Sequence, residues 1–488
     1  MTAVDELVAG LDAAAGVWIG GQWRSGSSGR FAVDDPADGT TIAEVADAGA
    51  PDAAAAVDAA AAAAADWAAT PPRQRSTVLH SVFELMRADL EQLAALITAE
   101  NGKALSDARA EVGYAAEFFR WYAEEAVRSD GTVSPAPGGG ARTLVTQRPV
   151  GVAALVTPWN FPAAMVTRKI APALAAGCTV VVKPAAETPL TALAIARLLA
   201  RAGVPDGVVN VVPTTDPGVV VGAWLADPRV RKVSFTGSTP VGRLLLHQAA
   251  DRVLNASMEL GGNAPFVVTA DADLSAAVDG AMIAKFRGGG QACTAANRFL
   301  VHADVADAFT GLLAERVQAL RVGPGADPAT EVGPLINARA VARVAGLVDR
   351  ARSAGARVVA EAAVPRGSGY WCPPVVLADV PAGADLVTEE IFGPIAPVVT
   401  YRSEAELIEL ANATEMGLAA YVYSRDLHTA LRLAERIDAG MVGVNRGVVS
   451  DPAAPFGGMK QSGLGREGAR EGLQAFTETQ YLSVDWPA

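Results

Sequence analysis

A cysteine follows three consecutive glycines within residues 286–298, Phe-Arg-Gly-Gly-Gly-Gln-Ala-Cys-Thr-Ala-Ala-Asn-Arg. Gly288, Gly289 and Gly290 permit backbone conformations that a side chain forbids, and they let a ligand approach closely. A thiol delivered in this way, that of Cys293, can act as a nucleophile. Most free cysteines are instead small buried hydrophobic residues, so this stretch by itself only raises the hypothesis.

A second candidate is a carboxylate in an apolar segment, Glu259, which precedes Gly261 and Gly262. Carboxylates are rarely buried without a partner. Burial raises the pKa of a carboxyl group, and such a group can serve as a general base. The alternative is a structural ion pair, and from this residue alone the ion pair is the better interpretation.

Other chemical patterns are incomplete. Residues 463–468 match the dinucleotide-binding glycine pattern, but no strand closely precedes them and too few residues follow for a βαβ unit. Residues 237–242 have phosphate-loop spacing but are followed by Arg243 instead of Lys and Ser or Thr. Their place before a helix still suits an anion. The four histidines are scattered, so we expect no metal site.

Composition argues against several classes of protein. The 488 residues carry a net charge of −13 and no basic run, so nucleic acid is not an expected partner. No apolar run reaches the roughly 18 residues of a membrane span, and no signal peptide is evident. The three cysteines are odd in number and far apart, which predicts a cytoplasmic protein without a disulfide framework.

The elements that must position these groups follow from an alternation in the middle of the chain. Valine-rich runs at 150–156, 179–183, 208–212 and 232–235 alternate with helical segments at 163–176, 189–202, 219–226 and 241–249. This pattern predicts a parallel sheet with helical crossovers. Ligands bind at the carboxyl ends of strands in such sheets, which here carry the loops 157–160, 183–186 and 236–239.

A second alternation begins near Ser257 and predicts a second α/β domain that starts near Met258. Its expected strands are residues 265–269, 299–301, 357–360, 374–377, 397–401, 419–423 and 441–445, and its expected helices are 305–320, 338–353, 404–413 and 429–437. The alanine-rich stretch 51–69 predicts a helix, and helical patterning continues over 73–127. A break at 129–141, an exposed strand at 142–148 and a tail strand at 480–484 complete the pattern. We predict an α/β fold with two doubly wound parallel-sheet domains.

Seven short motifs in this order resemble those of the aldehyde dehydrogenase superfamily. They are Pro158-Trp-Asn-Phe-Pro162, Lys183-Pro-Ala, Phe235-Thr-Gly-Ser238, Glu259-Leu-Gly-Gly262, Gly290-Gln-Ala-Cys293, Glu389-Glu-Ile-Phe-Gly-Pro394 and Pro455-Phe-Gly-Gly458. The match runs over nearly the whole chain. Within the superfamily, residues 161–169, 285–287 and 447–451 are most similar to the succinate-semialdehyde dehydrogenases.

The resemblance implies roles for the residues already singled out. Cys293 would attack an aldehyde to form a thiohemiacetal, and hydride loss would leave a thioester. The Asn160 amide and the Cys293 backbone N–H would stabilise the oxyanion. Glu259 would activate the water that hydrolyses the thioester. Lys169 and Glu478 match positions that relay protons in relatives.

The resemblance also implies a nicotinamide cofactor. The residues expected to bind it are Thr157, Pro158, Trp159, Lys183, Ala186, Gly237, Ser238, Glu390 and Phe392. Relatives that prefer NAD often carry Glu three residues after this lysine, whereas Ala186 leaves no carboxylate to repel a 2′-phosphate. The serine common in relatives that prefer NADP is absent too, and the direction of Glu187 is open. We expect use of NADP, with dual use of NAD as the alternative.

The substrate implied is a small aldehyde with a distal carboxylate. Arg168, Arg287 and Ser450 map to the two arginines and the serine that hold this carboxylate in the resembled enzymes, and arginine suits a carboxylate because it makes paired hydrogen bonds. The expected reaction is oxidation of succinate semialdehyde to succinate, which the family links to GABA degradation. Another ω-carboxylated aldehyde, such as glutarate semialdehyde, is the alternative. Ala295 replaces the second cysteine that several relatives use as a redox switch, so we expect no such switch.

By the same resemblance, residues 1–128 and 149–257 form a Rossmann-like cofactor-binding domain and residues 258–471 a catalytic domain. Residues 129–148 and 472–488 form an oligomerisation arm, which implies a homodimer or homotetramer. Three other classes remain as alternatives: a CoA-acylating dehydrogenase, a cysteine hydrolase without cofactor, and an inactive binding protein. The first is disfavoured by the base Glu259, the second by the lack of a base partner, and the third by the complete residue set.

Overall fold

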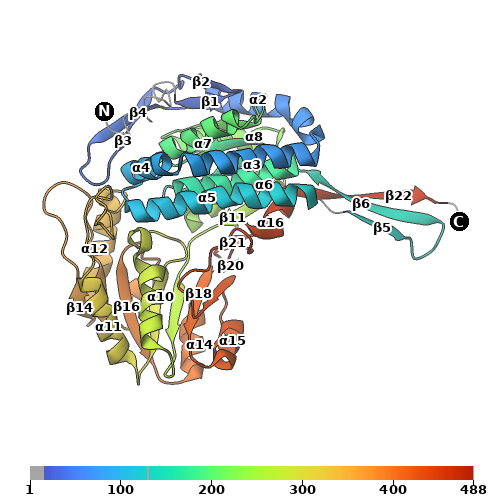
Figure 1. Ribbon diagram of the computed structural model, residues 1–488. Helices are drawn as coiled ribbons and strands as arrows, with labels where there is room; N and C mark the ends of the chain where they lie inside the picture. The colour runs from blue at the N-terminus through green and yellow to red at the C-terminus, as the bar shows by residue number, and fades with distance from the viewer. Residues whose placement is uncertain (1–15, 129–130, 487–488) are drawn as a thin grey trace.

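The computed structural model describes residues 16–128 and 131–486. Two sheet-based units stack one above the other, and a narrow β arm extends from the side of the upper unit (Figure 1). The expected α/β class is confirmed. None of the helices in the described part of the chain is both long and apolar enough to span a membrane.

The upper unit is built on an eight-stranded sheet whose five central strands are parallel and whose edges are antiparallel. The strand order is β2 (Gln22–Arg24), β1 (Val17–Ile19), β9 (Val209–Val211), β8 (Thr179–Lys183), β7 (Val152–Val156), β10 (Val230–Thr236), β11 (Asn255–Glu259) and β21 (Gly463–Leu464). The central strands are almost wholly buried, which explains their continuous valine runs.

Helices cover both faces of this sheet. One face packs against α3 (Pro72–Ala88), α4 (Leu90–Asn101), α5 (Leu105–Glu125), α6 (Pro162–Ala176) and α7 (Pro189–Arg201). The other packs against α2 (Ala50–Ala69), α8 (Pro217–Ala226) and α9 (Thr239–Ala250). The alanine-rich stretch is therefore an ordered helix, as expected, because its small side chains let α2 pack against α8 and β8. The hairpin β3 (Arg30–Asp34) and β4 (Thr41–Ala46) lies outside the main sheet.

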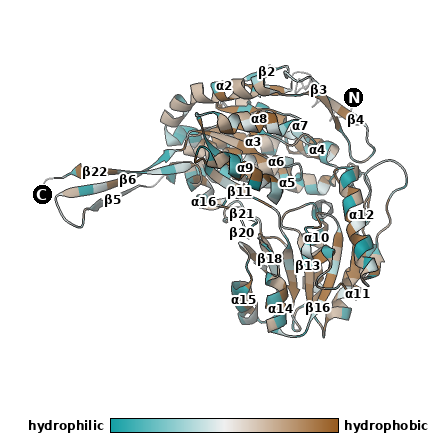
Figure 2. Cartoon of the chain, turned by 180° about the vertical axis from the view of Figure 1, so that it is seen from behind, coloured by the Kyte–Doolittle hydropathy of each residue, from teal (hydrophilic) through white to brown (hydrophobic). Residues whose placement is uncertain are grey.

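The lower unit has a seven-stranded sheet, parallel except at the edge strand β14. The order is β14 (Arg357–Glu361), β15 (Val375–Ala378), β16 (Ile395–Tyr401), β13 (Ala296–His302), β12 (Ala264–Val268), β18 (Ala419–Tyr423) and β19 (Met441–Val444). Helices α10 (Leu274–Phe286) and α11 (Ala306–Gln318) cover one face, and α12 (Ala338–Ser353), α14 (Glu404–Asn412) and α15 (Leu427–Arg436) cover the other. Figure 2 shows hydrophobic colouring along the strands between these helices.

Several short elements complete the two units. They are the 3-10 turns η1 (Ala126–Arg128) and η2 (Arg287–Gly290), helices α13 (Asp385–Thr388) and α16 (Ala469–Gln474), and the strand pair β17 (Met416–Gly417) and β20 (Met459–Lys460). The chain thus returns to the upper unit after the lower one, since β21 pairs with β11. The boundaries of the cofactor-binding and catalytic domains stay a prediction.

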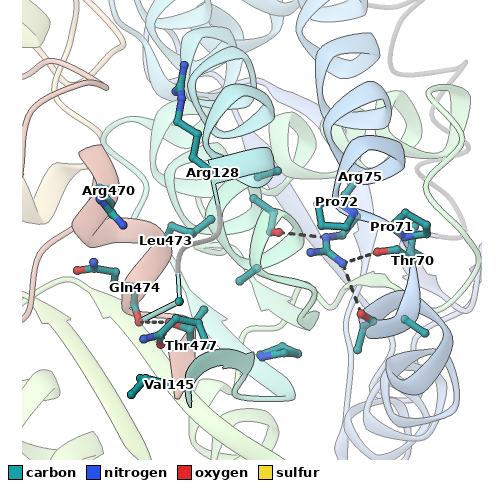
Figure 3. Close-up of a pocket in the computed structure, with 18 of the residues that line it drawn as sticks. Thr70, Pro71, Pro72, Arg75, Arg128, Val145, Arg470, Leu473, Gln474 and Thr477 are labelled. Carbon is teal, nitrogen blue, oxygen red and sulfur yellow. Dashed lines mark hydrogen bonds between the residues drawn. The ribbon is translucent and has the colours of Figure 1, made fainter. Parts of the chain in front are cut away.

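The arm is a three-stranded antiparallel sheet of β22 (Thr477–Asp485), β6 (Ala141–Pro149) and β5 (Thr132–Pro135). Its strands are largely exposed, including the side chains of Val133, Tyr481 and Leu482. A cavity of about 460 Å³ lies where the arm joins the body (Figure 3). There the buried Arg75 donates hydrogen bonds to the carbonyl oxygens of residues 68, 70 and 175.

Most of the expected helices and strands are present, with the following exceptions. The helical region 73–127 is divided into α3, α4 and α5 at Asp89 and Gly102. The break expected at 129–141 contains strand β5, and its residues 129–130 lie outside the described part. Helix α10 and strand β11 had no counterpart among the expected elements. Strand β11 matters most because it ends at Glu259.

Candidate active site

Two cavities meet at Cys293. The first, here called the arginine cavity, has a volume of about 200 Å³ and is lined by Arg168, Arg287, Ser450, Cys293 and other residues. The second, the strand-end cavity, has a volume of about 400 Å³ and lies against the carboxyl ends of β7 and β10. Since Cys293 and Met165 line both, the sulfur stands where contents of the two cavities would meet.

The three glycines before the cysteine adopt the left-handed conformation predicted from their type. Their φ angles are +59° at Gly288, +65° at Gly289 and +73° at Gly290. A Cβ on Gly290 would lie 2.4 Å from the carbonyl oxygen of Gly393, so this backbone approach requires glycine. The turn is tied to α5 by Asp107, which accepts a hydrogen bond from the Gly288 N–H.

The thiol of Cys293 is half-buried and borders both cavities. Burial raises its pKa to about 12, and the nearby guanidinium of Arg168 only partly offsets this effect. The cysteine is therefore protonated at neutral pH when the cavities hold no ligand. Because only the thiolate is a competent nucleophile, a base must take the proton as the reaction begins.

Asn160 borders the strand-end cavity beside Cys293. Its side-chain Nδ2 donates to the carbonyl oxygen of Gln291 at 2.9 Å, which leaves the second N–H of the amide for another acceptor. The Cys293 backbone N–H is directed at its own sulfur. Both groups can thus donate to an oxygen formed at the carbon that the sulfur attacks.

A buried ion pair holds Asn160 in place. Lys103 Nζ contacts Glu111 Oε2 at 2.5 Å and donates to the backbone oxygen of Asn160 at 2.7 Å. The other oxygen of Glu111 accepts from the N–H groups of Ala163 and Ala164 in the first turn of α6. A carboxylate there satisfies helix donors and complements the helix dipole. The sequence contained this pair, but its residues come from separate elements and no local pattern indicated it.

Glu259 stands at the end of β11, with only 2% of its surface exposed. Burial and the negative charge of Glu467 raise its pKa well above the usual range, although Lys169 and Arg168 oppose the shift. Its Oε2 has no hydrogen-bond partner among the described residues. A Cβ on Gly457 would lie 2.9 Å from its Oε1. Glu259 is thus a confined carboxyl group, and its raised pKa makes the carboxylate a stronger base than an exposed one.

The carboxylate beside Lys169 is Glu467, which the sequence analysis did not select. Lys169 Nζ lies 2.5 Å from Glu467 Oε1, and Arg168 Nη1 lies 3.8 Å from Glu467 Oε2. Glu478, the other position expected in a proton relay, is exposed on β22 opposite Arg148, and its role in a relay stays a prediction. Glu467 lies inside the glycine pattern that was rejected as a nucleotide site, and no local signal marked it.

Arg168, Arg287 and Ser450, predicted as a set, all line the arginine cavity. The guanidinium of Arg168 lies 4.0 Å from the Phe456 ring centroid, and its Nη2 donates to the Tyr114 hydroxyl at 2.7 Å. Its Nε is buried without a hydrogen-bond partner among the described residues. An unpaired buried donor on a cation favours an anionic ligand there. Sequence reasoning missed Tyr114 and Phe456.

Six of the nine expected cofactor residues line the strand-end cavity: Pro158, Trp159, Gly237, Ser238, Glu390 and Phe392. The rings of Trp159 and Phe392 meet edge to face at 5.5 Å. Thr157, Lys183 and Ala186 do not line this cavity, although the Thr157 N–H donates to the Lys183 carbonyl oxygen. Burial lowers the pKa of Lys183. The basic side chains Arg339 and Arg343 also line the cavity and were not foreseen.

These residues fit a phosphate-bearing ligand. The cavity lies at the N-terminus of α9, whose unpaired N–H groups favour an anion. The Thr236 hydroxyl, at the edge of this cavity, is buried without a partner among the described residues. Glu390 accepts from the Gly262 N–H at 2.9 Å, and burial raises its pKa to about 7. These groups could hold a pyrophosphate and a ribose.

Comparison with known proteins gives a consistent result. The family model described as "Aldehyde dehydrogenase family" matches residues 23–482. A succinate-semialdehyde dehydrogenase from Paenarthrobacter nicotinovorans is 54% identical over 91% of this chain and 99% of its own. A glutarate-semialdehyde dehydrogenase from Pseudomonas putida is 46% identical over 96% of this chain and 97% of its own. The crystal structure of an NADP-dependent enzyme from Escherichia coli, 45% identical, matches 98% of this chain and 99% of its own with a TM-score of 0.96.

Proposed function

The chain belongs to the aldehyde dehydrogenase family, and from this premise we propose that it oxidises succinate semialdehyde to succinate with NADP+. The observation that carries the proposal is the position of Cys293 between the two cavities. One cavity presents two arginines and a serine to a carboxylate, and the other presents a helix N-terminus to a phosphate-bearing cofactor.

The residues of the chain divide the chemistry among them. Cys293 loses its proton and attacks the aldehyde carbon, while the amide of Asn160 and the Cys293 N–H donate to the resulting oxyanion. Bound in the strand-end cavity, a nicotinamide cofactor supplies a hydride acceptor. Glu259 then removes a proton from water, whose oxygen attacks the thioester and releases the acid and the Cys293 thiolate.

The substrate is held at its far end. A carboxylate between Arg168 and Arg287 fixes the other end of a short semialdehyde near the sulfur, and such orientation lowers the barrier. Because the cavity of about 200 Å³ is small, chain length matters. Glutarate semialdehyde, one carbon longer, is the second candidate because a relative bearing that name is nearly as similar.

The cofactor preference rests on Ala186. Burial lowers the pKa of Lys183, and the charge of Glu187 opposes this shift. With alanine at 186, no carboxylate at that position opposes a 2′-phosphate, which supports NADP as the main cofactor and NAD as a weaker one. A preference for NAD of about 100-fold, roughly 2.7 kcal/mol, would contradict this.

The decisive experiment measures NADPH formation at 340 nm with the four-carbon and five-carbon semialdehydes and with butanal. We expect the highest kcat/KM for succinate semialdehyde, and no activity from Cys293→Ser, which keeps the shape of the side chain. A higher kcat/KM for the five-carbon semialdehyde would show that glutarate semialdehyde is the preferred substrate. Absence of NADPH with every aldehyde would overturn it.

We also propose that the arm, residues 129–148 and 472–488, joins copies of this chain into a dimer or tetramer in the cytoplasm. Its exposed apolar side chains and the unpaired edges of β5 and β22 support this assembly. Light scattering on the purified chain tests it. A monomer at micromolar concentration would refute the proposal.

A further inference from the structure

Two neighbouring strands of the upper sheet, β10 and β11, carry polar side chains on one buried face. Lys232 and Ser234 of β10 lie opposite Asn255 and Ser257 of β11 in the parallel register. We call these four residues the polar ladder. The intervening residues Val233, Phe235 and Met258 point to the opposite face and pack in its apolar core. The ladder ends one step from Glu259, which pairs with Thr236.

Hydrogen bonds connect most of the ladder to the active site. Lys232 Nζ donates to Asn255 Oδ1 and to Ser257 Oγ, each at 2.7 Å. Lys169 Nζ donates to Ser234 Oγ at 3.0 Å and also contacts Glu467, whose charge acts on Glu259. Ser234 and Ser257 are directly paired on adjacent strands, which lie about 4.8 Å apart. The described residues show no direct hydrogen bond between the two hydroxyls, and at that spacing one water between them would complete the link.

Lys232 is buried, and none of the carboxylates in the described part of the chain contacts it. It is 0% exposed, its contacts are an amide oxygen and a hydroxyl, and the Phe476 ring lies 5.0 Å from Nζ. Burial and the charge of Lys169 lower its pKa to about 7, although Cys178 and Glu467 oppose the shift. These three groups are the titratable neighbours that act on it. An amine of this kind can accept and release protons at neutral pH.

The reaction needs an exit for protons. Aldehyde, oxidised cofactor and water yield acid, reduced cofactor and one proton, which leaves through the base Glu259. Substrate fills the arginine cavity and cofactor fills the strand-end cavity during turnover. The ladder leads elsewhere, to the half-buried Asn255, which follows an exposed turn in which Val253 is 91% exposed.

We propose that the polar ladder conducts the reaction proton from the Glu259–Glu467 pair to solvent at Asn255, with Lys232 as the relay. Glu467 receives the proton from Glu259, and Lys169 takes it up while giving one of its own to Ser234. Ser234 passes a proton to Ser257, and Ser257 passes one to the neutral amine of Lys232. The Lys232 ammonium returns to its amine by releasing a proton to water at Asn255, so every group regains its starting state. Lys232 contacts neither substrate nor cofactor and acts through Glu467. The inference rests on the proposed dehydrogenase function.

The test follows proton release directly in stopped flow, with a pH-indicator dye in weak buffer and NADPH absorbance in parallel. In the wild type, proton release keeps pace with turnover. In Lys232→Met and Ser257→Ala we expect proton release and kcat to fall about tenfold while the first burst of NADPH keeps its rate. Thr179→Val removes a buried hydroxyl from β8 of the same sheet and should leave both signals unchanged.

Lys232→Arg distinguishes proton conduction by Lys232 from a purely structural role of its side chain. Arginine keeps the charge and donors but stays protonated, so conduction requires it to be as slow as Lys232→Met. Rescue of proton release by Lys232→Arg, or unchanged proton release in Ser257→Ala, would overturn the proposal. Ser257→Ala removes one oxygen and decides the matter even if the lysine variants do not fold. A wild type that makes no NADPH refutes the function itself, whereas normal NADPH formation with normal proton release in Ser257→Ala refutes only the ladder.

Discussion

Loss of the Arg168 guanidinium should change which aldehydes are oxidised, and the structure sets the size of the effect. Arg168 is buried, is held by Tyr114 and Phe456, and lines the arginine cavity. A substrate carboxylate can therefore gain at least one charge-assisted hydrogen bond. Hydrogen bonds to charged groups contribute about 1.5–3 kcal/mol, which corresponds to about 10- to 150-fold in kcat/KM.

The perturbation is Arg168→Met, which keeps the length of the apolar stem. It also removes a cation near Cys293 and Glu259, and this loss affects every aldehyde. The informative quantity is thus the ratio of kcat/KM for succinate semialdehyde to that for butanal, measured by NADPH absorbance. Butanal has the same four carbons but no carboxylate to bind.

We expect this ratio to fall about 10- to 150-fold in Arg168→Met. Ser450→Ala is the matched control, because it removes a neutral donor from the same cavity and should lower the ratio by only about fivefold. A ratio in Arg168→Met that stays within about twofold of the wild type would refute the carboxylate clamp.

Three further predictions concern the reacting groups. Burial raises the pKa of Cys293 to about 12. Inactivation of the unliganded enzyme by iodoacetamide should therefore be slow at pH 7 and should accelerate as the pH rises toward this pKa. A rate that does not change between pH 7 and pH 10 would contradict this. In Gly457→Ala, the new Cβ would crowd Glu259 Oε1. We therefore expect kcat to fall about 10-fold or more while the first burst of NADPH remains. An unchanged kcat would show that Glu259 is not confined at this position. In Glu467→Gln, the charge that raises the pKa of Glu259 is lost, so the acid limb of the kcat–pH profile should move to lower pH; a move to higher pH would show that the contact with Lys169 dominates.

The strands of both sheets could be predicted because the residue pattern that produces each strand lies within the strand itself. Parallel strands buried on both faces must be apolar throughout, so β8 and β18 read as continuous hydrophobic runs with the bounds observed. Helix α10 was missed because its apolar residues do not gather on one helical face, and β11 because polar side chains interrupt it. Strand β11 is polar because its face serves the ladder and Glu259.

The amino-acid sequence by itself determined the order of the elements, the conformation of the glycine turn and the set Cys293, Asn160, Arg168, Arg287 and Ser450, which the structure brings to the two cavities. Only the tertiary structure decided which carboxylate contacts Lys169. Lys169 pairs with Glu467, 298 residues away, and not with Glu478. A buried lysine must be paired with a carboxylate that the fold brings next to it. The spacing of residues along the sequence does not show which carboxylate that is.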